Sequence, residues 1–258
     1  METFKPAENG NIQMYFKGLT AGFSIKTNGT TCIINWGDGT TENANGMGTI
    51  YKHTYNADDF YQVEISNCKE VSYCRPAGAK LVAYWSIGNS KTKNLSFGND
   101  KDIVYVGDIF KNDTERTDFS QCLSGCSSLV SFHSGLFDSC EKATSFRYCF
   151  GRCGNLTSIP EGLFDNCLEV TNFSECFHVC ESARKLPELW LKFYNSSVKR
   201  EKCFEQCISA SNYSSVPVSW GGTAPEYVPP VVASGVSLAD YRAINARLSN
   251  IEEKLNLN

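Results

Sequence analysis

A strict period of 27 residues is the feature that most constrains the fold of this chain. Cysteines and apolar side chains recur at this spacing through the middle of the sequence, and so many columns with one period do not arise by chance. A unit of this length cannot bury its apolar face alone, so successive units must stack on one another. The cysteine columns are Cys122, Cys149, Cys176, Cys203; Cys126, Cys153, Cys180, Cys207; and the shorter Cys140, Cys167. The apolar columns are Phe119, Phe146, Phe173; Leu123, Phe150, Phe177, Phe204; Phe132, Ile159, Leu186, Tyr213; and Phe137, Phe164, Leu191.

The pattern within one unit predicts a short helix followed by a short strand. Phe146, Cys149, Phe150 and Cys153 are spaced at i, i+3, i+4 and i+7, which places them on one face of a helix. Residues 155–160 alternate as a brief strand that ends in proline. The preceding stretch predicts a degenerate first unit, as expected at the end of a repeat array. Its apolar residues Leu95, Tyr105, Ile109 and Phe110 are in register with Cys122, Phe132, Leu136 and Phe137.

The repeated cysteines are predicted to be buried thiols. Free cysteine is among the most buried residue types, and one inward position recurs in each unit. Disulfides between stacked units are an alternative, as is a zinc site built on the Cys-x-x-x-Cys spacing. No repeating histidine completes a tetrahedral zinc site, and the 13 cysteines leave at least one without a partner inside the chain.

Residues 150–167, which read FGRCGNLTSIPEGLFDNC, resemble the BspA-type leucine-rich repeat. The resemblance covers roughly residues 93–213. That family is found in surface proteins of gut and oral bacteria, in protists and in phages of gut bacteria, and the resemblance implies a surface-displayed adhesion or recognition scaffold. The third repeat departs from the pattern, with Ala183 in place of leucine and Trp190-Leu191 in place of Leu-Phe.

The residues before the repeats have the pattern of short strands and turns. Residues 23–26, 32–36 and 61–65 are predicted strands, and residues 37–40 form a glycine-containing turn. The run Trp36-Gly37-Asp38-Gly39-Thr40, followed by His53-Thr54-Tyr55, resembles the polycystic-kidney-disease (PKD) type of immunoglobulin-like domain. This resemblance implies a spacer and adhesion domain, extracellular or in a virion, without catalysis of its own.

Two residues of this segment have chemical alternatives. Asp38 could be an acid catalyst or a calcium ligand, but a turn aspartate that binds its own backbone is the favoured interpretation. His53 is expected to pack against Trp36 or to bond to a strand, rather than to act in chemistry.

The C-terminal part predicts a linker and a helix. Residues 216–236 are rich in proline and glycine, and residues 237–258 carry apolar side chains at alternating spacings of three and four. This seam predicts oligomerisation, with a trimer favoured, and the alternative is a single helix docked on its own chain. The oligomerisation residues are Tyr241, Ile244, Leu248, Ile251 and Leu255.

These patterns together predict an α+β fold in four parts. A small PKD-like β-sandwich is expected over residues 1–75, and a short-helix, short-strand leucine-rich-repeat solenoid over residues 76–215. A proline- and glycine-rich linker over residues 216–236 then leads to a C-terminal coiled-coil helix over residues 237–258.

Composition and motifs argue against most chemistry. The net charge of −4 provides no basic field for nucleic acid, and no stretch has the ~20 apolar residues of a membrane span. No nucleophile elbow, phosphate-binding loop or metalloprotease motif is present. We therefore expect no enzyme activity, no cofactor and no metal. A glycan-active enzyme is the chemical alternative. The residues that follow Met1 lack the pattern of a signal peptide, so either such a segment has been removed or the protein is made in the cytosol, and Met1 favours the second.

The two resemblances and the expected oligomer predict a fibre-like virion structural or appendage protein of a phage of gut bacteria. Its expected partners are further copies of the chain, other virion proteins, and host cell-surface glycans or proteins. The alternative is a secreted adhesin on a bacterial cell surface. Aromatic and cationic side chains of the repeats are candidates for a recognition surface, namely Arg147, Tyr148, Arg152 and Trp190.

Overall fold

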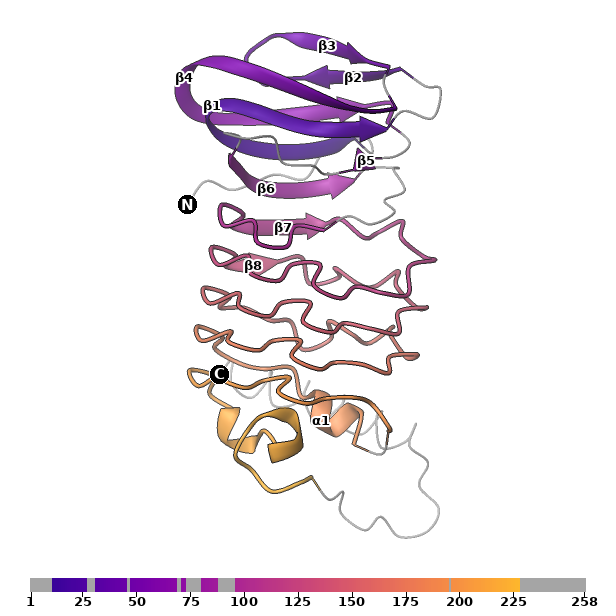
Figure 1. The fold of residues 1–258 in the computed structure, drawn as a ribbon, viewed down its shortest axis with the longest axis vertical. Helices are drawn as coiled ribbons and strands as arrows, with labels where there is room; N and C mark the ends of the chain where they lie inside the picture. Colours follow the sequence, from indigo (N-terminus) through magenta and orange to yellow (C-terminus); the bar gives the residue numbers. More distant parts are fainter. Residues whose placement is uncertain are drawn as a thin grey trace, which may run out of the picture. The chain divides into compact units, whose positions relative to one another are not determined.

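The computed structural model describes residues 11–26, 31–45, 47–68, 71–72, 80–87, 96–194 and 196–227. Its main feature is one mixed sheet of eight strands in the order β3-β2-β4-β1-β6-β7-β8, with β5 pairing with β1 beside this path (Figure 1). The strands are β1 (Ile12–Lys26), β2 (Cys32–Asn35), β3 (Thr41–Ala44), β4 (Met47–Ser66), β5 (Val71–Ser72), β6 (Lys80–Ile87), β7 (Tyr105–Asp108) and β8 (Ser131–Phe132).

The long strands β1 and β4 form an antiparallel ribbon that curves around its own core. Their register shifts between Gly18 and Thr20, where Gly18 has a φ of 110° and gives the ribbon an irregular point at which to turn. Side chains from both halves of β1 then meet inside, since the rings of Phe16 and Phe23 lie 6.3 Å apart. Trp36 closes this core, with its ring 5.4 Å from that of Phe23.

The sheet continues from these strands into the repeats. Strand β6 pairs antiparallel with β1 and parallel with β7, and β7 pairs parallel with β8. The expected fold class is therefore wrong: the described residues form mostly one mixed sheet with almost no helix, rather than a β-sandwich followed by a solenoid of short helices. The nonlocal pairing of β1 with β6 crosses the expected boundary between residues 1–75 and 76–215 and joins the two parts that the sequence pattern separates.

The predicted repeat helices are absent from the described residues, where runs of tight turns take their place. The only α-helix in this part is α1 (Leu189–Lys192), accompanied by the short 3₁₀ helices η2 (Tyr213–Ser215) and η3 (Val218–Trp220). The backbone reason is visible in one unit. Tyr148 and Arg152 have φ of 56° and 63°, in the left-handed region, so the chain cannot continue as a right-handed helix past either residue.

Each unit is tied to the next by backbone hydrogen bonds in a constant register. The N–H groups of Tyr148, Phe150 and Arg152 donate to the carbonyls of Ser174, Cys176 and His178 of the following unit. The intervening N–H groups donate within their own turns, as Cys149 does to the carbonyl of Phe146. Two residues therefore face inward and the next two outward. This alternation buries positions i, i+3, i+4 and i+7, the same spacing from which a helix was predicted.

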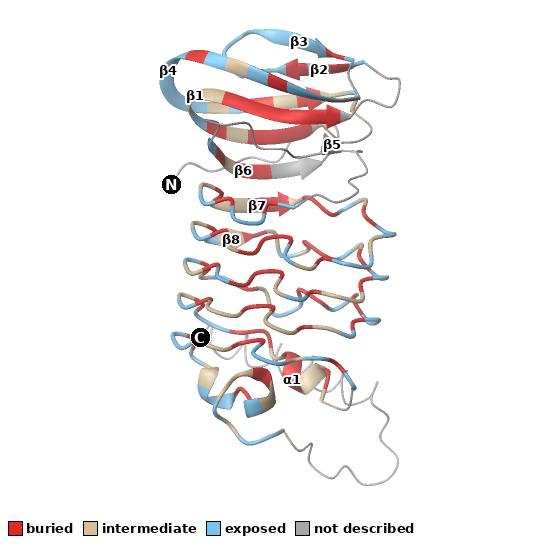
Figure 2. Cartoon of the chain, viewed as in Figure 1, coloured by how far each residue is buried: buried red, intermediate tan, exposed pale blue. Residues whose placement is uncertain are grey.

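Buried segments recur from unit to unit along the repeats (Figure 2), and ladders of aromatic rings and thiols fill the inside of the units. The rings of Phe150 and Phe177 stack at 5.1 Å, and those of Phe177 and Phe204 at 5.7 Å. The Sγ of Cys153 donates to the carbonyl of Leu123 in the preceding unit at 3.1 Å, and Cys180 donates likewise to Phe150 at 3.2 Å. The predicted burial of the cysteine columns is confirmed, since all ten of their members are buried.

The first unit is shifted by one residue from the expected register over part of its length. We expected Tyr105 to match Phe132, but β7 places Tyr105 opposite Ser131 and Val106 opposite Phe132. Phe110 does match Phe137, and their rings stack at 5.6 Å. The first unit therefore has one residue fewer between Tyr105 and Phe110 than the next unit has between Ser131 and Phe137. A prediction that assumes a constant period cannot detect this.

The repeat array ends in a cap. Phe204 donates its N–H to the carbonyl of Trp220, and the two rings stack at 6.0 Å, so Trp220 takes the place that a phenylalanine of a further unit would occupy. The chain divides into two compact units, Met1–Glu226 and Tyr227–Asn258. Residues 237–258 of the expected coiled coil lie outside the described residues, and the four expected domain boundaries stay predictions.

Candidate functional site

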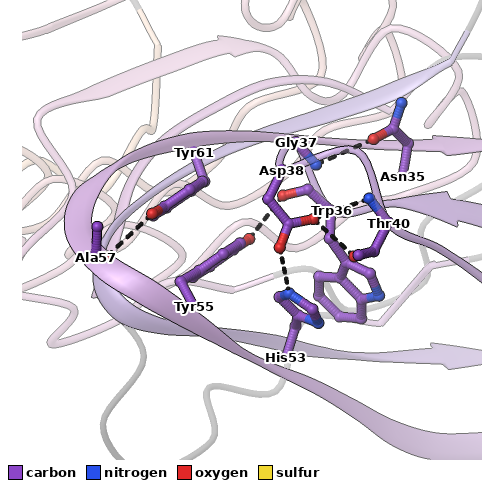
Figure 3. Close-up of polar contacts among 9 residues, drawn as sticks. All are labelled: Asn35, Trp36, Gly37, Asp38, Thr40, His53, Tyr55, Ala57 and Tyr61. Carbon is purple, nitrogen blue, oxygen red and sulfur yellow. Dashed lines mark hydrogen bonds and ion pairs between the residues drawn. The ribbon is translucent and has the colours of Figure 1, made fainter.

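One polar cluster surrounds the turn between β2 and β3 (Figure 3). Asp38 Oδ1 accepts hydrogen bonds from the backbone N–H of Thr40 at 3.0 Å and from its hydroxyl at 2.6 Å. The other carboxylate oxygen lies 2.8 Å from His53 Nε2 on β4. Gly37 is required here, because its φ is 85° and a Cβ would lie 2.5 Å from the carbonyl oxygen of Gln62.

This cluster fastens the turn to the curved strand β4. The His53 ring stacks on Trp36 at 5.0 Å, and the Tyr55 hydroxyl donates to the carbonyl of Trp36 at 2.8 Å. Both expectations for this segment are confirmed: Asp38 binds its own turn, and His53 packs against Trp36. The Thr40 hydroxyl and then the Thr40 backbone N–H lower the pKa of Asp38 to about 2.

No nucleophile of the described part of the chain is bonded to the histidine of the Asp38–His53 pair. Among the described residues, His53 makes no hydrogen bond to a serine, threonine or cysteine, and the Thr40 hydroxyl donates to Asp38 instead. A triad needs the nucleophile within hydrogen-bond reach of the histidine. The geometry thus supports a structural role for the pair.

A second candidate lies on the outward side chains of the stacked turns, here called the repeat face. The two-in, two-out pattern of each unit creates four outward columns. They are Ser120, Arg147, Ser174, Glu201; Gln121, Tyr148, Glu175, Lys202; Ser124, Gly151, His178, Glu205; and Gly125, Arg152, Val179, Gln206. The inward columns repeat phenylalanine and cysteine, whereas the outward columns change in chemistry from unit to unit.

Two of the outward columns have left-handed backbone at every member. The φ values are 58°, 56°, 58° and 56° in the column of Tyr148, and 71°, 63°, 59° and 64° in the column of Arg152. Glycine or asparagine would adopt this conformation at lower cost, and Val179 is the least suited of all because it is β-branched. These side chains are held at some expense in backbone strain.

Tyr148 lies at the centre of the repeat face. A Cβ on Gly151 would fall 2.9 Å from three ring atoms of Tyr148, so the ring lies directly over the glycine. The ring of His178 in the next unit is 6.2 Å away, tilted by 39°. His178 Nδ1 lies 3.2 Å from a Glu205 carboxylate oxygen, but the two form no hydrogen bond in this geometry.

The two arginines beside Tyr148 differ in how they are bound. Arg147 Nη2 donates to Glu175 Oε1 at 3.4 Å. The exposed guanidinium of Arg152 has no ion pair or hydrogen bond with any part of the chain that the structure describes. Three of the four residues expected in a recognition surface, Arg147, Tyr148 and Arg152, are therefore together.

Trp190 lies elsewhere. It is buried in α1, with its ring 5.8 Å from that of Phe204, and so it belongs to the core. The sequence argument missed Gly151, Glu175 and His178 as neighbours of Tyr148. Their common register was available from the 27-residue period, but the residue types vary down each column and gave no signal.

The remaining predictions concern oligomerisation, metal ions, membrane spans and disulfides. The five oligomerisation residues, Tyr241, Ile244, Leu248, Ile251 and Leu255, lie outside the described residues. Within the described ranges, no group of three histidine, cysteine or acidic side chains is placed to hold a metal ion. No described helix has the length and hydropathy needed to cross a bilayer. The described cysteines form no disulfide.

Comparison with known proteins gives no relative: no protein-family model, no curated protein and no solved structure matches this chain.

Proposed function

We propose that this chain is a non-enzymatic recognition protein whose repeat face binds a partner at a cell surface. One observation carries the proposal: the outward columns vary in chemistry while the inward columns repeat, and in two of the four outward columns the variation occurs at left-handed positions where glycine would be less strained. Backbone strain that stability does not require is typical of functional positions. The resemblance to surface-displayed repeat scaffolds points to the same function.

The chain is further proposed to be a virion structural or appendage protein of a phage of gut bacteria, assembled as a homo-oligomer with a trimer favoured. The thiols of Cys126, Cys153, Cys180 and Cys207, each of which donates to a backbone carbonyl, support this placement, because proteins made in a reducing cytoplasm keep their cysteines reduced. Labelling purified phage particles with antibodies against the protein tests the placement. Label on bacterial envelopes instead of particles would contradict it.

Binding to intact cells tests the recognition function. The labelled full-length protein is added to a panel of gut bacteria, and bound fluorescence is measured for the wild type and for the double variant Tyr148→Ala/Arg152→Gln. We expect the wild type to bind some strains and the double variant to lose about tenfold in affinity, as for a central interface residue.

Matched controls are available on other parts of the units. Arg184→Gln removes an exposed arginine and Leu168→Ala removes a side chain that is 64% exposed, both outside the repeat face. Both should bind within about twofold of the wild type, as surface positions away from a contact do. Wild-type binding to no strain, or equal binding by the double variant, contradicts the proposed function.

A further inference from the structure

We propose that the repeat face binds a saccharide unit that carries a carboxylate, with the sugar ring stacked on Tyr148 and the carboxylate paired with Arg152. This inference rests on the proposed function and names the chemical class of its ligand. It follows from three properties of the described residues: the fixed ring, the uncommitted guanidinium, and the polar character of their surroundings.

The Tyr148 ring is held as a platform. Gly151 leaves room beneath it that no other residue would leave, since a Cβ there would meet three ring atoms at 2.9 Å. The equivalent positions in the other units are Ser124, His178 and Glu205, so this arrangement occurs in one unit alone among the four. A half-exposed aromatic ring with a fixed orientation presents an apolar surface to the C–H groups of a sugar ring and a hydroxyl to its polar edge.

Arg152 supplies the anion contact. Its guanidinium is exposed and unpaired within the described residues, whereas Arg147 is engaged with Glu175. A guanidinium is planar and always charged, and it pairs with a carboxylate through two parallel hydrogen bonds. The Tyr148 ring lies over Gly151, the residue that precedes Arg152 in the chain, and we place one ligand residue across this ring and the guanidinium.

The rest of the repeat face fits a saccharide better than a folded protein. Apart from Tyr148, its only apolar side chain is Val179, so it lacks the apolar centre of a protein interface. The ion pair Arg147–Glu175, with side chains 49% and 30% exposed, provides polar groups around the ring. Hydroxyl groups of a sugar are suited to such groups because they both donate and accept hydrogen bonds.

Calorimetric titration of the full-length protein with paired saccharides tests the inference. The acidic probes are sialyllactose and a hyaluronan hexasaccharide, and their neutral counterparts are lactose and chitohexaose. We expect the wild type to bind at least one acidic probe about tenfold more tightly than its counterpart, as a charge-assisted contact would give. The two arms distinguish a sialic acid from a uronic acid.

Five variants assign the roles, and thermal melts check that each is folded. Arg152→Gln should reduce acidic binding about tenfold to the neutral level, and Arg184→Gln should leave it unchanged. Tyr148→Ala should abolish binding of both probe types, whereas Tyr148→Phe should stay within about twofold because the ring remains. Gly151→Ala keeps both contact groups but displaces the ring, and should weaken binding about fivefold.

The outcomes separate this inference from the proposed function. Wild-type binding to no acidic probe at millimolar concentration, or acidic binding unchanged in Arg152→Gln, overturns the ligand class. In that case, weaker binding of the double variant Tyr148→Ala/Arg152→Gln to intact cells than of the wild type would mean that the repeat face recognises a ligand of another class. If cells bind that variant as well as the wild type, the proposed function itself fails.

Discussion

The cysteines of the repeats act as hydrogen-bond donors between units. In the column of Cys153, each Sγ reaches a carbonyl of the preceding unit at 3.1 or 3.2 Å. Burial raises the pKa of Cys153 and Cys207 to about 12, so these thiols keep the proton that they donate. Cysteine suits this core because its side chain is small and apolar and its S–H is still a weak donor. It can therefore bind the one carbonyl of each unit that faces inward.

These thiols predict a loss of stability at alkaline pH. Their pKa is higher in the folded chain than the ordinary value of 9.0, so their contribution is fully present below pH 9 and decreases as the pH rises toward about 12. Thermal melts at pH 7, 9 and 10.5 should show the midpoint falling above pH 9. The fall should be smaller in Cys153→Ala, and an equal fall in both proteins would contradict this origin.

Val179 is the left-handed residue least suited to its conformation. Replacing it by glycine should increase the free energy of unfolding by about 1 kcal/mol, because a β-branched side chain at φ 59° costs roughly that much. Val130→Gly is the control, since Val130 is partly exposed but does not have a positive φ. Urea denaturation should show opposite signs for the two variants. A destabilised Val179→Gly would mean that side-chain packing outweighs backbone strain.

At the scale of elements, burial alone did not distinguish a helix from the observed turns. The inward residues Phe146, Cys149, Phe150 and Cys153 were identified correctly, because two-in, two-out turns and a helix bury the same positions. The left-handed residues decide between the two, and they were not readable because Tyr148 and Arg152 carry no glycine-like signal. The turn at Asp38 was predictable, because its glycines and aspartate act locally.

Phe150 should be among the most important side chains of the stacked turns. It is fully buried and its ring stacks on Phe177 at 5.1 Å and on Phe132 at 4.7 Å. Phe150→Ala should lower the free energy of unfolding by about 3–5 kcal/mol, measured by urea denaturation. Phe60→Ala removes a ring that is 40% exposed and should cost far less. Similar losses in both would argue against a tightly packed array.

The turn at Asp38 should stabilise the chain in a pH-dependent way. Because the pKa of Asp38 is lowered from 3.8 to about 2, its contribution is present above pH 4 and is lost as the pH falls toward 2. Asp38→Asn should therefore melt at a lower temperature than the wild type at pH 7, with the difference shrinking at pH 2. The exposed Asp58→Asn serves as control. A constant difference at both pH values would exclude the carboxylate as its source.

At the scale of the whole molecule, the single sheet could not be predicted from the 27-residue period. The pairing of β1 with β6 is nonlocal, and the first unit slips by one residue at Tyr105, so neither follows from a period of 27. The cap by Trp220 likewise depends on a contact with Phe204 that sequence spacing does not indicate. Local patterns gave the units, whereas their connection to the N-terminal strands required the structure.

The oligomeric state is the prediction that belongs to the whole chain. We expect light scattering at micromolar concentration to give the mass of a trimer for the full chain and of a monomer for a chain that ends at Ser234, which lacks the five oligomerisation residues. Several copies of a weak binding surface would strengthen attachment without any new contact. A monomer in both samples would favour the alternative of a bacterial adhesin.

Because the register between units is constant, the number of units in this protein can change by duplication or deletion in its gene. An in-frame duplication of the 27 codons for residues 146–172 would create a seam with the same hydrogen bonds as the existing ones, and would leave β7 and Trp220 at their ends. Duplication or deletion of one unit can therefore change the number and the residue types of the outward positions in a single step, while the protein keeps an intact stack of units.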